Sequence, residues 1–578
     1  MNLLRLMRTA LAPYRRQVAV VVLLTALQTG VGLYLPNLTA NIINNGIAKG
    51  DVGYIWSTGA VMLALTLAQG VVAVTAVYFA SRTSMGVGRD LRQAIFTRVM
   101  GFSAREMNHF GTPSLITRNT NDVQQIQIFL QMALTLMVGA PIMMVGGIFM
   151  ALSEDVRLSL VLVVTVPLMA VVIALMLTRA VPLFQAMQMK IDRINQVLRE
   201  QITGVRVIRA FVRNDYETGR FAAANSDLTS TGLRVNRIFV LALPTLMGIM
   251  NLTSVGVLWF GGGLISRGQM PIGNLTAFLA YILQILMSVL MAVMMVILVP
   301  RAQASSDRVL EVISTEPVLT SPPAPRSPLA RLGEVTLRQV SFAYPGGEAP
   351  VLAELDFQLR PGQTTAIIGG TGAGKTTLLG LIARFFDVSS GQLLVDGVDV
   401  REQPLEELWA GIGLVPQQAY LFSGTVRANL ELAREGVTDA EIWQALEIAQ
   451  ARDFVADMPG QLDYALDQGG TNVSGGQRQR LSIARALVRR PRIYLFDDCF
   501  SALDAATDAR LRAALRGATV ESTVVIVAQR VSTILDAEQI VVLDAGRVVG
   551  IGRHRELLTS CPAYREIVAS QLGEEAAA

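Results

Sequence analysis

Eight residues in the second half of the chain have the types and spacing needed to hold phosphate groups. They read GGTGAGKT (369–376), after the apolar run TTAII and before the helical pattern TLLGLIARFF. Glycines let the backbone wrap closely, so that amide hydrogens point at phosphate oxygens near a helix N-terminus. Lys375 adds a compact positive charge, and the Thr376 hydroxyl suits magnesium. The pattern predicts a nucleotide phosphate site, with a Gly-rich turn arising by chance as the alternative.

Two acidic residues follow the apolar stretch RIYLF (492–496), which has the composition of a buried strand. Asp497 comes directly after it, and an acid in this place beside a phosphate loop is suited to hold magnesium. A structural acid that caps the following loop is the alternative. Asp498 comes next, where a longer carboxylate side chain is expected in a nucleotide-hydrolysing site. The pair therefore raises the question of how well this chain hydrolyses a nucleotide.

A third candidate for phosphate binding is VSGGQRQRLSIARAL (473–487), in which a pair of glycines leads into a helical pattern. The free amides at the N-terminus of such a helix, together with the Ser474 hydroxyl, suit a phosphate group. The same residue types also form an ordinary helix cap. Both interpretations are compatible with the residue types.

The elements that must position these motifs belong to one part of a chain that is too long for a single core, at 578 residues. The Pro-rich string TSPPAPRSP (320–328) divides the chain and is typical of a linker. Long apolar runs precede it, and alternating strand and helix signals follow it. We predict a transmembrane domain over residues 1–312, a linker over 313–332 and a nucleotide-binding domain over 333–578.

Composition agrees with a membrane half and a soluble half, because 52% of residues are hydrophobic, 16% are charged and the mean hydropathy is +0.45. Only two cysteines are present, Cys499 and Cys561, which excludes a disulfide framework and fits a reducing compartment. The net charge is only +4, and basic residues cluster at the edges of apolar runs, so we expect no nucleic-acid partner. No small-residue cleavage site follows the first apolar run, so we expect no removable signal peptide.

Six stretches are long and apolar enough to cross a bilayer, which needs about 20 residues. None contains Asp, Glu, Lys or Arg in its interior, and they lie at about 17–43, 54–80, 128–152, 158–178, 238–264 and 272–299. Four arginines precede the first stretch, and the long segments after the second and fourth are rich in Arg. The positive-inside bias predicts a multi-pass protein of the cell (inner or plasma) membrane, with both termini and the nucleotide-binding domain in the cytoplasm.

The two long segments between spans, 81–127 and 179–237, are too long and too periodic to be turns. Leu91, Ile95 and Val99 are at helical spacing, for example. We expect the spans to continue as helices beyond the membrane and to reverse near HFGTPSLITR (109–118) and AFVRNDYETGRF (210–221). Helical loops that lie on the membrane are the alternative.

Taken together, the phosphate loop, VSGGQ, the strand acid and SALD (501–504) resemble the motifs of ATP-binding-cassette (ABC) transporters. The apolar runs resemble one half of the six-span exporter class (type IV), so the resemblance covers nearly the whole chain. It implies an α-helical six-span transmembrane domain with long cytoplasmic helical extensions, followed by an α/β P-loop NTPase domain, the ABC cassette. It also implies ATP and Mg²⁺ as cofactors. In that family two cassettes face head to tail, and each ATP lies between the phosphate loop of one and the signature motif of the other.

The resemblance assigns roles to individual residues. Tyr344 in FAYPG would stack on adenine, Gln417 in VPQQAYLF would sense magnesium and the membrane half, and Asp504 would lie between the two sites. A strand aromatic, a solvated loop residue and a helix cap are the respective alternatives. Magnesium would be held by Thr376, Gln417 and Asp497. ATP would be held by Tyr344, Gly369, Gly370, Thr371, Gly372, Ala373, Gly374, Lys375, Thr376 and Thr377, and the partner's ATP by Ser474, Gly475, Gly476 and Gln477.

Two catalytic positions depart from the family pattern. Asp498 stands where hydrolytic sites have a Glu and is one methylene shorter, and a misplacement of about an ångström can cost about a hundredfold in rate. Gln529 in VVIVAQRVST stands where the family has a switch histidine, and an amide carries no charge. Since the signature motif is nearly intact, the chain resembles the degenerate half of a heterodimeric exporter. A homodimer in which Asp498 works slowly is the alternative.

The expected partner is a second ABC half-transporter that supplies a Glu and a switch histidine. Charge-free spans argue against a proton relay or an inorganic-ion path. Met287, Met291, Met294 and Met295 suit an adaptable wall for greasy substrates, although methionines at helical spacing are more often packing. We therefore expect membrane lipid and hydrophobic or amphipathic small molecules, such as drugs or lipids, as substrates. The sequence is also compatible with an importer of siderophores or lipids on the same fold, and with a regulatory half that hydrolyses nothing.

Overall fold

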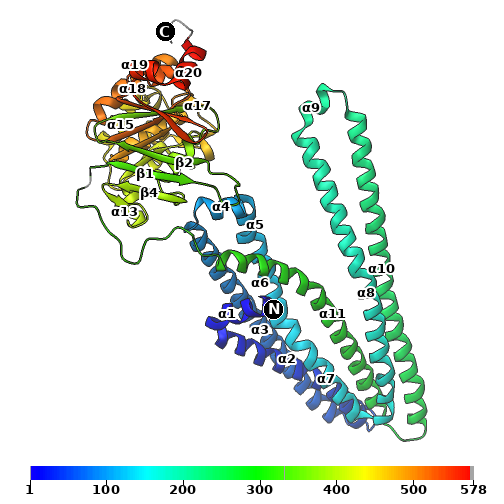
Figure 1. Ribbon diagram of the computed structural model, residues 1–578. Coiled ribbons are helices and arrows are strands. Elements are labelled where there is room, and N and C mark those ends of the chain that lie inside the picture. Colours follow the sequence, from blue (N-terminus) through cyan, green and yellow to red (C-terminus); the bar gives the residue numbers. More distant parts are fainter. Residues whose placement is uncertain (1, 331, 573–578) are drawn as a thin grey trace. The chain divides into compact units, whose positions relative to one another are not determined.

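The computed structural model describes residues 2–330 and 332–572, and the chain forms two compact units (Figure 1). One unit holds Met1–Met100 and Gly111–Thr315, and the other holds Gly101–Phe110 and Glu316–Ala578. The described residues of the first unit form helices and their connections, and the second unit contains all the described strands.

The first unit contains six helical stretches long and apolar enough to cross a membrane. The prediction of six spans is therefore confirmed. The helices are α1 (Asn2–Ala10), η1 (Ala12–Tyr14), α2 (Arg15–Asn41), η2 (Ile42–Ile47), α3 (Val52–Met100), α5 (Thr112–Thr117), η3 (Arg118–Asp122), α6 (Val123–Met132), η4 (Ala133–Met137), α7 (Val138–Glu154), α8 (Val156–Thr203), α9 (Val205–Ala210), α10 (Asn214–Ser266) and α11 (Ile272–Ser314).

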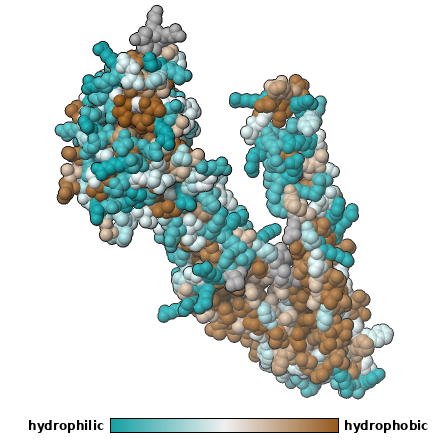
Figure 2. Space-filling model, viewed as in Figure 1, coloured by the Kyte–Doolittle hydropathy of each residue, from teal (hydrophilic) through white to brown (hydrophobic). Residues whose placement is uncertain are grey.

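Several of these helices are far longer than a bilayer requires. Helix α8 has 48 residues and α10 has 53, which at 1.5 Å per residue correspond to roughly 70–80 Å, against about 30 Å of hydrocarbon. Figure 2 shows hydrophobic residues gathered toward one end of this unit and hydrophilic residues along the arm of α8 and α10 that leads to α9. The expected helical extensions beyond the spans are therefore confirmed.

The two helices of that arm pack along each other, and α9 closes them at the tip (Figure 1). The start of α8 is fixed locally, because the side chain of Asp155 accepts hydrogen bonds from the backbone N–H groups of Arg157 and Leu158 at 2.7 and 3.0 Å. An acid at this position caps the free amides of a first helical turn. The reversal expected within 210–221 lies at α9 and the start of α10.

The cassette unit is built on a six-stranded sheet in the order β12-β11-β3-β10-β9-β6, parallel except for β12. Strands β9 and β10 are buried at every residue, as expected for strands covered on both faces. A four-stranded antiparallel sheet, β2-β1-β4-β5, lies in the same unit. The strands are β1 (Val335–Phe342), β2 (Leu352–Leu359), β3 (Thr364–Gly369), β4 (Ser390–Val395), β5 (Val398–Asp399), β6 (Ile412–Val415), β7 (Gly424–Thr425), β8 (Ala465–Leu466), β9 (Ile493–Asp497), β10 (Thr523–Val527), β11 (Gln539–Asp544) and β12 (Arg547–Gly552).

Helices alternate with the strands of this unit, as is usual in α/β proteins, and α19 and α20 follow the last strand. They are α12 (Lys375–Ile382), α13 (Leu405–Ala410), α14 (Val426–Glu431), α15 (Asp439–Ile448), α16 (Arg452–Ala456), η5 (Gln461–Asp463), η6 (Gln468–Gly470), α17 (Gly475–Arg489), α18 (Ala505–Ala518), η7 (Val531–Thr533), α19 (His554–Ser560) and α20 (Pro562–Leu572), with α4 (Ala104–Phe110) assigned to the same unit. The predicted α/β P-loop domain is confirmed by this arrangement.

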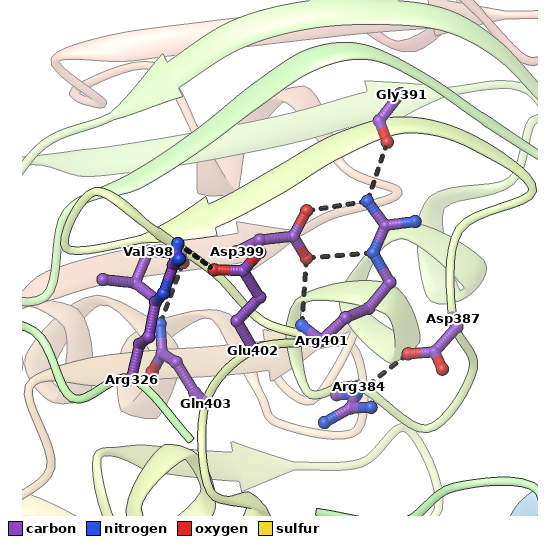
Figure 3. Close-up of polar contacts among 9 residues, drawn as sticks. All are labelled: Arg326, Arg384, Asp387, Gly391, Val398, Asp399, Arg401, Glu402 and Gln403. Carbon is purple, nitrogen blue, oxygen red and sulfur yellow. Dashed lines mark hydrogen bonds and ion pairs between the residues drawn. The ribbon is translucent and has the colours of Figure 1, made fainter. Parts of the chain in front are cut away.

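The Pro-rich segment before β1 is attached to the cassette surface. The backbone N–H of Arg326 donates to the carbonyl oxygen of Glu402 at 2.8 Å, and the two side chains form an ion pair at 3.0 Å (Figure 3). The Ser327 hydroxyl donates to Glu407 Oε2 at 3.0 Å. Nearby, Arg401 pairs with Asp399 in the same close-up. The segment predicted as a linker is therefore held on the cassette over these residues.

Candidate nucleotide site

The phosphate loop follows β3 and leads into α12, as its sequence predicts. Gly374 has φ of +92°, and a Cβ there would lie 2.5 Å from a side-chain carbon of Leu352. At Gly369 a Cβ would lie 2.1 Å from the carbonyl oxygen of Leu543 in the neighbouring strand. Glycine is required at both positions, because any side chain would force the loop away from β11 or out of its turn.

Lys375 lies beneath this loop at the N-terminus of α12. Its Nζ donates to the carbonyl oxygens of Gly369 and Gly370 at 2.8 and 2.7 Å. Burial lowers the pKa of the ammonium group, while the charges of Asp498 and Asp497 act in the opposite direction. An ammonium has three donors, so a third remains for a phosphate oxygen.

The magnesium candidates come from two neighbouring elements. The Thr376 hydroxyl on α12 donates to Asp497 Oδ1 at 3.1 Å, at the end of β9. Burial raises the pKa of Asp497, and the Asp498 carboxylate adds to the rise, whereas Thr376 and Lys375 oppose it. A bound cation would relieve this unfavourable burial of charge. The paired hydroxyl and carboxylate oxygens are ligands that Mg²⁺ prefers.

Asp498 is almost fully buried and has an unusual backbone, with φ of +45°. Its N–H donates to the carbonyl oxygen of Val527 at 3.0 Å, and its Oδ2 accepts from Gln417 Nε2 at 3.2 Å. Burial raises the pKa of Asp498, and the hydrogen bond from Gln417 opposes the rise most strongly. The structure thus brings together the phosphate loop, Asp497, Asp498 and Gln417.

These residues fit ATP with Mg²⁺. The loop offers backbone amides at the start of a helix, a half-buried ammonium, and a hydroxyl–carboxylate pair at one edge of the sheet. Lys375 and the loop amides would hold the phosphates, and Thr376 with Asp497 would hold the metal ion. Bound Mg²⁺ neutralises phosphate charge during hydrolysis.

Tyr344 is tied to this site by its hydroxyl. The hydroxyl group lies 3.0 Å from Thr377 Oγ1 on α12. The ring meets Phe342 and Phe386 edge-on, with centroid distances of 4.9 and 5.3 Å, and 39% of the residue remains exposed. Stacking of Tyr344 on adenine remains a prediction, and the bond to Thr377 shows how the ring is oriented.

The signature motif forms a helix cap within this chain. Ser474 Oγ accepts from the Gln477 N–H at 3.3 Å, and the Ser474 N–H donates to Gln477 Oε1 at 2.9 Å. This reciprocal capping box begins α17. Among the described residues, no hydrogen bond joins Ser474, Gly475, Gly476 or Gln477 to the phosphate loop. Their role toward a partner's ATP stays a prediction.

Two further positions are placed by local contacts. Asp504 caps α18 by accepting from the Thr507 N–H at 2.9 Å, which is the alternative that its sequence context left open. Gln529 is exposed just after β10, and its carbonyl oxygen accepts from Gln571 Nε2 at 2.8 Å. Sequence reasoning missed Gln571, since no motif marks a glutamine 42 residues away from the loop that it contacts.

Comparison with known proteins follows the same division of the chain. Residues 18–289 match the family model of the ABC transporter transmembrane region, and residues 352–501 match that of the ABC transporter. An uncharacterized ABC transporter ATP-binding protein of Mycobacterium tuberculosis (strain CDC 1551 / Oshkosh) is 48% identical over 573 residues, 98% of each chain. An ATP-dependent lipid A-core flippase of Chromobacterium violaceum is 31% identical over 92% of this chain and 91% of that protein.

A solved structure of a bacterial Atm1-family ABC exporter with ATP bound has a TM-score of 0.81 at 26% identity, over 97% of this chain and 99% of that one. Six apolar spans followed by a phosphate-loop cassette define an ATP-driven membrane transporter with the exporter fold. The chain belongs to the ABC transporter family.

Proposed function

We propose that this chain is one half of a heterodimeric exporter, holds ATP at a hydrolytically weak site and lends its signature motif to a competent site of its partner. The observation that carries the proposal is the environment of Asp498. Its carboxylate stands at the base position, is one methylene shorter than that of Glu, and is hydrogen-bonded to Gln417. A general base must reach its proton before its pKa matters.

The residue at the second proposed catalytic position, Gln529, also favours a weak site in this chain and a competent site in its partner. Gln529 carries no charge at any pH, and its described hydrogen bond is made by the backbone, to Gln571. By contrast, the groups proposed to bind ATP are all present. The capping box leaves Ser474, Gly475, Gly476 and Gln477 at an exposed helix N-terminus suited to a partner's phosphate.

Exposed apolar residues at the tip of the α8–α10 arm favour the presence of a partner half-transporter. Phe211 and Val212, between α9 and α10, are 73% and 84% exposed, and Tyr216 in the first turn of α10 is 65% exposed. Large exposed apolar side chains at the tip of a polar arm mark an interaction site. We propose that this reversal presses on a cassette of the dimer, as does the earlier reversal near Gly111.

The cargo proposed is amphipathic, a drug or a lipid of the surrounding membrane. The lipid named for the flippase relative and the apolar spans both favour this class. Met295 is buried among Leu3, Phe129 and Ala302, which is packing, whereas Met287 is half exposed. The side chain of Met294 lies outside the described residues.

The transporter is proposed to lie in the cell membrane with its termini and cassette in the cytoplasm. The test uses inside-out vesicles containing this chain and its partner. ATP added outside should drive a fluorescent amphipath inward, which is export. Loss of cargo from preloaded vesicles would instead establish import on the same fold.

The heterodimer is tested by ATP turnover of the purified chain, alone and with a half-transporter that carries Glu and a switch histidine. We expect slow turnover alone, fast turnover together, and loss when the partner's Glu is changed to Gln. Turnover at ordinary exporter rates by the chain alone would establish the homodimer instead. No turnover in either preparation would favour a regulatory half.

A further inference from the structure

The loop that carries Gln529 is held by a side chain from the last described helix. On α20, Gln571 donates from Nε2 to the Gln529 carbonyl oxygen at 2.8 Å, and Gln571 Oε1 accepts from the Val531 N–H at 2.8 Å. The two bonds flank Arg530, which has extended φ and ψ of −103° and 128°. The amide therefore pairs with this loop as one residue of a neighbouring β-strand would.

The position of Gln571 is determined by the hydrophobic core. Tyr564 and Val568 on the same helix are fully buried, and the Tyr564 hydroxyl lies 2.8 Å from His554 Nδ1. Residues 564, 568 and 571 are spaced to share one face of a helix. Helix α20 therefore delivers Gln571 to the loop from an anchored position.

The loop in turn adjoins the nucleotide site. Strand β10 ends at Val527, whose carbonyl oxygen accepts from the Asp498 N–H, and Gln529 and Arg530 follow as exposed residues. Burial raises the pKa of Asp498, and the charge of Arg530 is among the effects that oppose it. The backbone conformation of this loop therefore determines where the side chains of Gln529 and Arg530 start beside the nucleotide site.

We propose that Gln571 is a positioning residue for nucleotide turnover: its amide holds the Gln529–Val531 loop extended, so that helix α20 regulates how Gln529 and Arg530 face the nucleotide. This rests on the proposed function only in taking the loop as part of the ATP site. The two hydrogen bonds of Gln571 hold the loop backbone, so their effect on the loop conformation does not depend on which cassette hydrolyses ATP faster.

Three variants of the full chain, with its partner in lipid nanodiscs, test this. Gln571→Leu removes both bonds, and Gln571→Glu keeps an acceptor for Val531 but places a carboxylate against the Gln529 carbonyl oxygen. Ser570→Ala, on the same exposed turn, is the control. Hydrogen exchange in the peptide 528–534 should rise about tenfold in Gln571→Leu, less in Gln571→Glu, and not in Ser570→Ala.

The functional readout is kcat against KM for ATP, measured with the partner's catalytic Glu changed to Gln so that turnover reports the site of this chain. In Gln571→Leu we expect kcat to fall about threefold to tenfold, with KM and the melting temperature within error of the parent. In a Gln529→Ala/Arg530→Ala background the same change should leave kcat unaltered while exchange still rises. The proposal would be overturned if hydrogen exchange were unchanged in Gln571→Leu, or if Ser570→Ala had an equal effect. It would also be overturned if Gln571→Leu lowered kcat just as much in the Gln529→Ala/Arg530→Ala background.

The exchange result separates this proposal from the proposed function. If the chain alone hydrolyses ATP rapidly and Gln571→Leu still frees the loop and lowers kcat, the positioning role stands and the degenerate site does not. If Asp498 proves weak as proposed but exchange is unaffected by Gln571→Leu, the reverse holds.

Discussion

The side-chain amide of Gln417 donates a hydrogen bond to Oδ2 of Asp498 across 3.2 Å. Gln417 follows β6 and Asp498 follows β9, which are hydrogen-bonded neighbours in the parallel sheet. Asp498 also has φ of +45°, a left-handed conformation that Asp adopts more readily than most residues. The short carboxylate at the proposed base position is therefore held by the side chain of Gln417.

Removing that amide should change the pH dependence of this site. Burial raises the pKa of Asp498, and the bond from Gln417 is the strongest opposing effect, so Gln417→Ala should raise the pKa further. A base works only when deprotonated, so the acidic limb of the pH–rate profile should move to higher pH. The measurement is ATP turnover against pH with the partner's catalytic Glu changed to Gln.

The control for this experiment is Gln418→Ala. Gln418 is an exposed neighbour whose side chain makes no hydrogen bond within the described part of the chain. Its profile should match that of the parent. A shift of equal size in both variants would show that the loop, and not the amide, sets the pH dependence.

Lengthening the side chain at position 498, the proposed base position, should raise hydrolysis. Asp498→Glu returns the missing methylene, and correcting a misplacement of about an ångström should raise turnover at this site about tenfold to a hundredfold. Since Glu suits positive φ less well than Asp, we expect a slightly lower melting temperature. Gln529→His should add to the gain. Asp498→Asn is the control and should show no gain; if Asp498→Glu behaves like it, side-chain length does not limit the site.

Neutralising Asp497, the proposed magnesium ligand, should stabilise the protein without nucleotide. Burial raises the pKa of Asp497, so the folded chain binds this proton more readily than the unfolded chain. Its contribution to stability is thus fully present below the ordinary carboxyl pKa and is lost as pH rises through the raised one. At neutral pH, Asp497→Asn should raise the melting temperature by about 2–4 °C, corresponding to about 1 kcal/mol.

The same substitution should abolish magnesium-dependent ATP hydrolysis at this site, which is a trade of activity for stability. Glu538→Gln is a suitable control, because that carboxylate accepts a hydrogen bond from the exposed Thr364 N–H at the opposite end of β3. A lower melting temperature in Asp497→Asn would mean that the bond from Thr376 outweighs the cost of burial.

The meeting of the phosphate loop and Asp497 was predictable from sequence because both follow buried parallel strands. The carboxyl ends of parallel strands share one edge of a sheet, and β3 and β9 both pair with β10. The cap at Ser474 was also predictable, because the S-x-x-Q spacing is local. Local spacing and strand order thus account for most of the site.

The contacts that could not be predicted from sequence patterns join residues that are distant in the chain. The bond between Tyr344 and Thr377 spans 33 positions, and that between Gln571 and Gln529 spans 42. Both are set by how helices pack on the sheet, which hydrophobic periodicity does not specify. The π-helical turn at Arg118–Asp122 likewise has no signal in composition, and it is associated with burial of Asp122 against Ser305 and Arg308.

Two substitutions at Tyr344 should separate its hydroxyl from its ring. Tyr344→Phe loses only the bond to Thr377, and the ring keeps its contacts with Phe342 and Phe386, so affinity for ATP should fall less than about threefold. Tyr344→Ala also loses a stacking surface worth about 1–3 kcal/mol, so affinity should fall about tenfold or more. Binding of a fluorescent ATP analogue at equilibrium measures both. Equal losses in the two variants would assign the effect to the hydroxyl and remove adenine stacking from the site.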